Sequence, residues 1–126
     1  MTTLCDYEIE ALATNPDTLM IQPFAQRTET IDGKRVLSFG LGYIGYDIRL
    51  GNEFVKPRAR ILDPHTIDEN QWVRVQSNDG ITIPPASFLL ARSLETFRFP
   101  VNVYGEIFIK STYARLGLCM PATIFE

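Results

Sequence analysis

Residues 109–117 read Ile-Lys-Ser-Thr-Tyr-Ala-Arg-Leu-Gly and follow an apolar run, Val101 to Ile109, that is typical of a buried strand. The stretch offers the ammonium of Lys110, the hydroxyls of Ser111 and Thr112, and the guanidinium of Arg115. These groups suit a phosphate or a planar polar base. If Ser111 opens a short helix, its free backbone N–H groups favour an anion there, and Arg115 then shares the face of Ser111.

Two other interpretations apply to the same residues. Lysine, serine and arginine after a strand are also typical of a solvated turn with no ligand. Gly105, Lys110 and Ser111 partly match the phosphate-binding loop G-x-x-x-x-G-K-[ST], but Ile109 occupies the position of its second glycine. The sequence therefore excludes a P-loop and leaves the turn as the simplest alternative to a ligand site.

Four segments of the chain resemble, in order, the dCTP deaminases of the trimeric dUTPase-like superfamily. They are residues 45–51 (Gly-Tyr-Asp-Ile-Arg-Leu-Gly), 83–95 (Ile-Pro-Pro-Ala-Ser-Phe-Leu-Leu-Ala-Arg-Ser-Leu-Glu), 97–100 (Phe-Arg-Phe-Pro) and 110–118 (Lys-Ser-Thr-Tyr-Ala-Arg-Leu-Gly-Leu). Together these segments span most of the chain. The resemblance implies a distorted jelly-roll-like β-barrel, assembled as a homotrimer, and a substrate, dCTP, that becomes dUTP.

Composition predicts one globular domain, residues 1–126. Of the 126 residues, 45% are hydrophobic and 21% are charged, which is ordinary for a folded domain of this length. The net charge of -3 argues against binding of a nucleic-acid polymer, because no face can be broadly basic. A small phosphorylated ligand needs only a local basic pocket.

The cysteines and the apolar runs indicate a cytoplasmic protein with no membrane contact. Cys5 and Cys119 lie far apart and form no C-x-x-C pair, so neither a disulfide framework nor a zinc knuckle is expected. The N-terminus lacks a signal-peptide pattern, and no apolar run approaches the ~20 residues that span a bilayer. His65, the only histidine, follows Pro64 without a second histidine or a nearby cysteine, so no protein-held metal is expected.

The spacing of apolar and turn residues predicts an all-β fold with a short N-terminal helix. The helix is expected over Cys5 to Leu12, with Asp6 as its cap, and to stop at Asn15-Pro16-Asp17. Strands are expected at residues 19–22, 46–50, 53–56, 72–75, 81–83, 88–91 and 101–109, with a hairpin at 28–39 that turns at Asp32-Gly33.

The segments between these strands are predicted to be turns and loops. Gly40, Gly42 and Gly45 indicate a flexible connection, and Gly51-Asn52 indicates a turn. Residues 57–70 suit an exposed loop, and 77–80 a turn. Asp47 and Arg49 are expected to pair with each other or with neighbours rather than to act in catalysis.

The resemblance implies hydrolytic deamination of dCTP to dUTP and ammonia, in pyrimidine deoxynucleotide metabolism. Zinc deaminases carry H-x-E and P-C-x-x-C patterns, which this sequence lacks, and the family that it resembles works without zinc. In that family Mg²⁺ comes with the substrate triphosphate, and a glutamate acts as general base on the attacking water.

By the same resemblance, the substrate-binding residues are those of the 110–115 stretch: Lys110, Ser111, Thr112, Tyr113, Ala114 and Arg115. Ser111 and Arg115 are the expected catalytic residues. The hydroxyl of Ser111 would help to place the water or the leaving ammonia at C4 of cytosine. Arg115 would hold the base and orient the catalytic carboxylate, which needs a cation beside it to keep one geometry and protonation state.

The chain departs from the family in two places. The family's catalytic glutamate lies beyond the segment that residues 123–126 begin, so the domain is expected to be C-terminally incomplete relative to the family. Ile109 stands where the family commonly has glycine, and its branched side chain restricts the backbone. Three hypotheses stay open: a dCTP deaminase, a dUTPase-like pyrophosphatase that cuts the α,β-phosphate bond, and a truncated, non-catalytic nucleotide-binding or assembly module.

Overall fold

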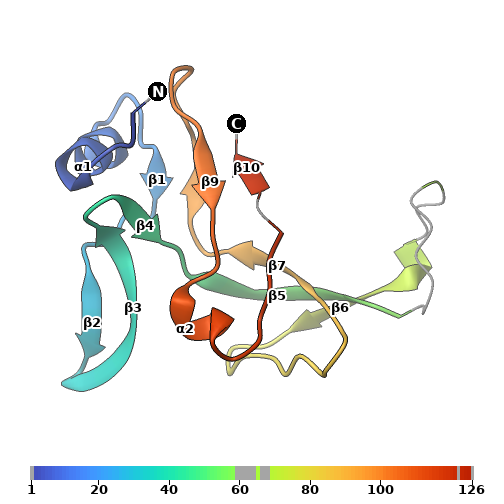
Figure 1. Cartoon of the computed structure of the whole chain (residues 1–126). Coiled ribbons are helices and arrows are strands. Elements are labelled where there is room, and N and C mark those ends of the chain that lie inside the picture. The colour runs from blue at the N-terminus through green and yellow to red at the C-terminus, as the bar shows by residue number, and fades with distance from the viewer. Residues whose placement is uncertain (1, 59–64, 66–68, 122, 126) are drawn as a thin grey trace. The chain divides into compact units, whose positions relative to one another are not determined.

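The computed structural model describes residues 2–58, 65, 69–121 and 123–125 (Figure 1). The chain divides into two compact units, Met1–Ile48 with Glu95–Glu126, and Arg49–Leu94. The prediction of a single domain stays a prediction.

The structure is mostly β, with one helix of more than a single turn. The helices are α1 (Asp6–Thr14) and α2 (Ser111–Ala114), with a 3₁₀ turn at Glu69–Gln71. The strands are β1 (Ile21–Gln22), β2 (Thr28–Ile31), β3 (Lys34–Gly42), β4 (Gly45–Asp47), β5 (Leu50–Pro57), β6 (Trp72–Gln76), β7 (Leu90–Ser93), β8 (Thr96–Phe97), β9 (Gly105–Ile107) and β10 (Thr123–Phe125). Among the described residues, no helix is long and apolar enough to cross a membrane.

Helix α1 forms where the apolar spacing predicts it, and it ends at Asn15, whose backbone is extended (φ -64°, ψ 125°). Its cap is Cys5 rather than the predicted Asp6. The Glu8 carboxylate accepts hydrogen bonds from the Cys5 backbone N–H at 2.9 Å and from the Cys5 thiol at 3.1 Å, which closes the first turn. The Asp6 carboxylate instead accepts the N–H of Tyr7, its sequence neighbour.

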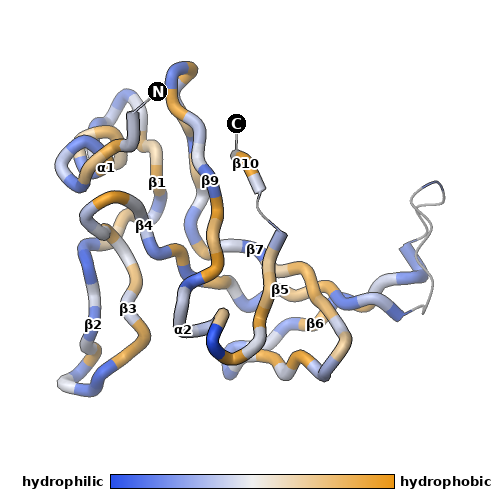
Figure 2. The backbone as a smooth tube through the Cα atoms, viewed as in Figure 1, coloured by the Kyte–Doolittle hydropathy of each residue, from blue (hydrophilic) through white to orange (hydrophobic). Residues whose placement is uncertain are grey.

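The core of the first unit lies between α1, β1 and β3. Its buried residues are Ile9, Ala13, Met20, Ile21 and Leu41, and partly buried apolar side chains pack around them, Leu12 among these. Polar and apolar residues alternate along α1 (Figure 2). The helix therefore buries one face and leaves the other to solvent.

Strands β2, β3 and β4 form an antiparallel sheet in the first unit. The hairpin between β2 and β3 is confirmed, and both turn residues have positive φ, 50° at Asp32 and 75° at Gly33, as a primed two-residue turn requires. The predicted flexible glycine connection is wrong, because Gly40 and Gly42 lie in β3 and Gly45 begins β4.

Gly40 is needed because the backbone of Ala25-Gln26 passes against it. Its φ is +88°, and a Cβ atom there would lie 2.3 Å from the carbonyl oxygen of Gln26. The N–H of the next residue, Leu41, donates to the Ala25 carbonyl at 3.0 Å. The glycine thus serves a close backbone approach inside a sheet and does not make the chain flexible.

The second unit is built on the sheet β6-β5-β7. The expected Gly51-Asn52 turn is wrong, because both residues lie inside β5. Strand β6 and the turn at residues 77–80 are confirmed, and the Ser77 hydroxyl donates to the Gly80 carbonyl at 2.6 Å. Residues 81–83 form no strand. Most of the predicted 57–70 loop lies outside the described residues, and His65 is exposed.

Two small antiparallel pairs, β1 with β8 and β9 with β10, complete the first unit. The apolar run at residues 101–109 is not one buried strand: only Gly105–Ile107 is extended, and Val101 and Phe108 are exposed. The described strands form four separate sheets of two or three strands. The all-β class with a short N-terminal helix is therefore confirmed and fits a dUTPase-like fold, but the predicted barrel is not closed within the described residues.

Candidate functional site

The segment that carries the predicted site is a one-turn helix with an anchored start. Ser111 is the first residue of α2, as the sequence predicts, and Lys110 precedes it with an extended backbone (φ -63°, ψ 137°). The Lys110 carbonyl accepts hydrogen bonds from the N–H groups of Tyr113 at 2.9 Å and Ala114 at 3.0 Å. After the helix Gly117 has a φ of +85°, where the chain turns away.

The Lys110 side chain points back to the β2-β3-β4 sheet. Its ammonium donates to the backbone carbonyl and to the hydroxyl of Ser38 in β3, each at 2.8 Å. It also forms an ion pair with the carboxylate of Asp47, the last residue of β4. Asp47 was expected to pair with a neighbour, and its partner is Lys110, 63 positions later in the sequence.

The rest of the predicted site is exposed. Ser111, Thr112, Tyr113, Ala114 and Arg115 all present surface to solvent. Within the described part of the chain, the side chains of Ser111, Thr112 and Arg115 make no hydrogen bond or ion pair. The Arg115 N–H donates to the Ser111 carbonyl at 3.0 Å, so the arginine lies one turn after the serine.

Among the described residues, this arrangement leaves one cation, Arg115, and three hydroxyls, of Ser111, Thr112 and Tyr113, without a partner on a single helical turn. The charge of Lys110 is balanced by Asp47, whereas the guanidinium of Arg115 has no described partner. A guanidinium with hydroxyls beside it can bind a phosphate, a carboxylate or the carbonyl and ring nitrogen of a base. Among the described residues, no group of three or more His, Cys, Asp or Glu could hold a metal ion.

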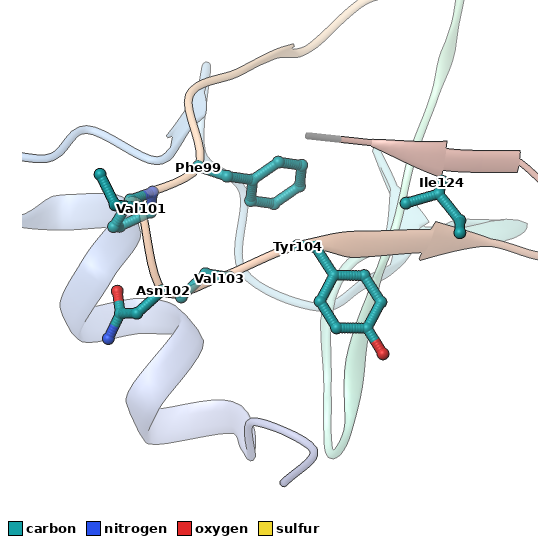
Figure 3. A pocket seen from close by; sticks show the side chains of 7 residues that line it. Phe99, Val101, Asn102, Val103, Tyr104 and Ile124 are labelled. Carbon is teal, nitrogen blue, oxygen red and sulfur yellow. The ribbon is translucent and has the colours of Figure 1, made fainter. Parts of the chain in front are cut away.

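A separate concave surface lies beside β9 and β10. It has a volume of about 610 Å³ and is lined by Phe99, Pro100, Val101, Asn102, Val103, Tyr104 and Ile124 (Figure 3). Apart from Asn102 and the Tyr104 hydroxyl, its side chains are apolar. None of the predicted site residues lines it, and nothing in the sequence singled it out as a site.

Sequence reasoning missed Ser38 as part of the site. A serine in the middle of a strand has no local pattern that marks it, and it lies 72 positions from Lys110. The contact becomes visible only when β3 and the start of α2 are placed in space. Asp47, by contrast, was expected to pair with Arg49 or with a neighbour rather than to act in catalysis.

The comparisons with known proteins all point to one family. A family model described as dCTP deaminase-like matches residues 3–125. The curated dCTP deaminase of Helicobacter hepaticus is 43% identical over 112 residues, and that of Neisseria meningitidis is 44% identical over 111 residues; each match covers 85% of this chain and 58% of the relative. The dCTP deaminase of Herminiimonas arsenicoxydans is 42% identical over 130 residues, covering 100% of this chain and 68% of the relative.

The match to the family model covers nearly all of this mainly antiparallel β fold, the exposed Ser-Thr-Tyr-Ala-Arg turn included. The chain is a member of the dCTP deaminase-like family, whose model spans nearly all of it. It spans 58% of the length of the relatives from Helicobacter and Neisseria.

Proposed function

We propose that this chain is a dCTP deaminase-like protein that takes part in the hydrolysis of dCTP to dUTP and ammonia. In this reaction water adds to C4 of cytosine, ammonia leaves from the same carbon, and the product carries a carbonyl oxygen there. The observation that carries the proposal is the exposed 110–115 turn, whose Ser111, Thr112 and Arg115 side chains have no described partner. Relatives named dCTP deaminase at 42–44% identity support the substrate.

The proposed roles follow from the chemistry of each side chain. Arg115, a cation with five donors, binds the base and orients the carboxylate that accepts a proton from water. The Ser111 hydroxyl can donate and accept, which suits the placement of the water or of the leaving ammonia at C4. Residues 110–115 together line the nucleotide.

Mg²⁺ belongs to the substrate in this proposal. It binds the oxygens of the triphosphate, as is usual for this ion, and enters with the nucleotide. No zinc takes part in the proposed reaction. We also propose a cytoplasmic homotrimer that acts in pyrimidine deoxynucleotide metabolism and supplies dUTP.

The test is an incubation of the purified chain with dCTP and Mg²⁺, followed by chromatographic separation of the nucleotides and an ammonia assay. We expect dUTP and ammonia in equal amounts. Ser111→Ala should abolish both, whereas Lys34→Met, which removes an exposed cation at the far end of β3, should change neither.

Other outcomes of this incubation separate the alternatives. Pyrophosphate release from dUTP would indicate the dUTPase-like reaction instead. Saturable dCTP binding without turnover would indicate a nucleotide-binding or assembly module. If the chain neither binds dCTP nor turns it over, the proposed function is overturned.

A further inference from the structure

We propose that Ser38 and Asp47 are positioning residues that act through Lys110, whose ammonium holds the start of α2 in place. The effect of this anchor on nucleotide binding rests on the proposed function, whereas its effect on the order of the α2 backbone does not. The proposal assigns to Ser38, which no motif includes, a role in setting the position of Ser111 and Arg115.

The hydrogen-bond geometry of Lys110 carries the first step. An ammonium has three N–H donors. The three acceptors in contact with it are the Ser38 carbonyl, the Ser38 hydroxyl and the Asp47 carboxylate, so each donor has a partner. Only 25% of the Lys110 side chain is exposed. A phosphate could reach the ammonium only by displacing one of these acceptors.

The position of Lys110 in the chain carries the second step. A four-residue helix is too short to be stable by itself, and no residue of α2 is buried. The sheet holds the side chain of Lys110. The carbonyl of the same residue accepts the first helical hydrogen bonds, from Tyr113 and Ala114. Fixing Lys110 therefore fixes the start of α2.

The pairing of β3 with β4 makes the anchor rigid. Gly40 lies opposite Asp47 in this ladder, and Ser38 is two residues before Gly40 on β3. The register of β3 against β4 therefore fixes the positions of both Ser38 and Asp47. Because Asp47 balances the charge of Lys110, Arg115 is the cation of this segment that is left for the nucleotide.

The first experiment measures the order of α2 without any nucleotide. Backbone ¹⁵N relaxation is compared for the wild type and for Asp47→Asn, Ser38→Ala and Lys110→Met. We expect the order parameters of residues 111–115 to fall from about 0.85 to below about 0.6, while the β2–β3 hairpin keeps its values. Lys34→Met, a matched loss of one lysine on the same sheet, should leave α2 unchanged. Unchanged order in all three anchor variants would overturn the proposal.

The second experiment measures binding of dCTP and of deoxycytidine, which has no phosphate. An anchor variant should weaken both by the same factor, about tenfold, which corresponds to the loss of a partly buried charged hydrogen bond. Lys110→Arg should weaken binding as the other anchor variants do, since a planar guanidinium cannot reach the three acceptors in the same way. The Asp47→Asn/Lys110→Met double variant should bind as the weaker single variant does.

Two results of the second experiment would contradict the proposal. If Lys110→Met loses affinity for dCTP but not for deoxycytidine, Lys110 is a phosphate ligand. If the effects of Asp47→Asn and Lys110→Met add, the two residues act separately. If the wild type binds neither ligand, the proposed function fails, and the relaxation experiment alone decides the role of the anchor.

Discussion

At the scale of single residues, two glycines of β3 and its turn have the same unusual backbone but different surroundings. Gly33 and Gly40 have φ values of +75° and +88°. A Cβ atom at Gly33 would meet nothing within 4 Å, whereas at Gly40 it would lie 2.3 Å from the Gln26 carbonyl oxygen. The pair separates the effect of a left-handed backbone from that of a close approach.

We expect Gly33→Ala to lower the free energy of unfolding by about 1 kcal/mol, since it introduces only backbone strain. Gly40→Ala should lower it by more than about 3 kcal/mol, because the backbone of Ala25-Gln26 must move as well. Urea unfolding followed by circular dichroism measures both. Equal losses would show that β3 does not need the close approach.

The ionisation of Glu8 makes the stability of the first turn of α1 depend on pH. The N–H of Cys5 and then its thiol donate to the Glu8 carboxylate, and they lower its pKa below the ordinary value. A carboxyl whose folded pKa is lowered stabilises the fold above its unfolded pKa of about 4.3, and this contribution is lost as the pH falls through the folded value.

We therefore expect Glu8→Gln to melt at a lower temperature than the wild type near neutral pH. The difference should shrink below about pH 4.3 and vanish once the wild-type carboxyl is protonated. Thermal melts across pH measure it. The control is Asp17→Asn, which removes a carboxylate that makes no described hydrogen bond or ion pair. A constant Glu8→Gln difference down to low pH would contradict this prediction.

At the scale of elements, α2 is exposed and depends on contacts made before it. Its own side chains contribute little packing, because none of them is buried. Stability and nucleotide binding should therefore respond to different residues of the same segment.

Arg115→Ala should weaken dCTP binding by about ten- to a hundredfold, as the loss of a hydrogen bond to a charged group does, and leave the melting temperature unchanged. Asp47→Asn should alter both quantities, because it frees the start of α2. Calorimetric titration and thermal melting measure the two effects. A lower melting temperature for Arg115→Ala would show that the guanidinium supports the fold.

Which elements the sequence predicts depends on how local their cause is. Helix α1 and the Asp32-Gly33 hairpin are predicted correctly, because apolar spacing and turn chemistry act over a few residues. The glycines of β3 and the run at 101–109 are misread. The conformation of Gly40 depends on the backbone segment that passes against it. The length of the strand in 101–109 depends on its pairing with β10, which covers only Gly105–Ile107.

At the scale of the whole molecule, the surface carries many large apolar side chains. Large exposed ones include Tyr43, Ile44, Val101, Phe108, Leu116 and Ile124. So much exposed apolar surface is uncommon in a monomer and favours association.

We expect the chain to self-associate, with a species at three times the monomer mass as the proposed trimer. Sedimentation velocity over a range of concentrations measures this. Phe108→Glu should shift the distribution toward smaller species, while Lys34→Met, on an exposed polar position, should not. A sharp monomeric peak at all concentrations would contradict the prediction.

The sequence by itself determined the family, the all-β class and the first helix, and it predicts the six residues of the candidate site. These depend on order along the chain: four motifs in sequence, the spacing of apolar residues, and turn residues that act on their neighbours. The tertiary structure alone decided that Lys110 is held by Ser38 and Asp47, 72 and 63 positions away, and that Arg115 has no partner among the described residues. The physical reason is that a hydrogen bond acts over about 3 Å, so partners distant in sequence are chosen by the path of the chain through space.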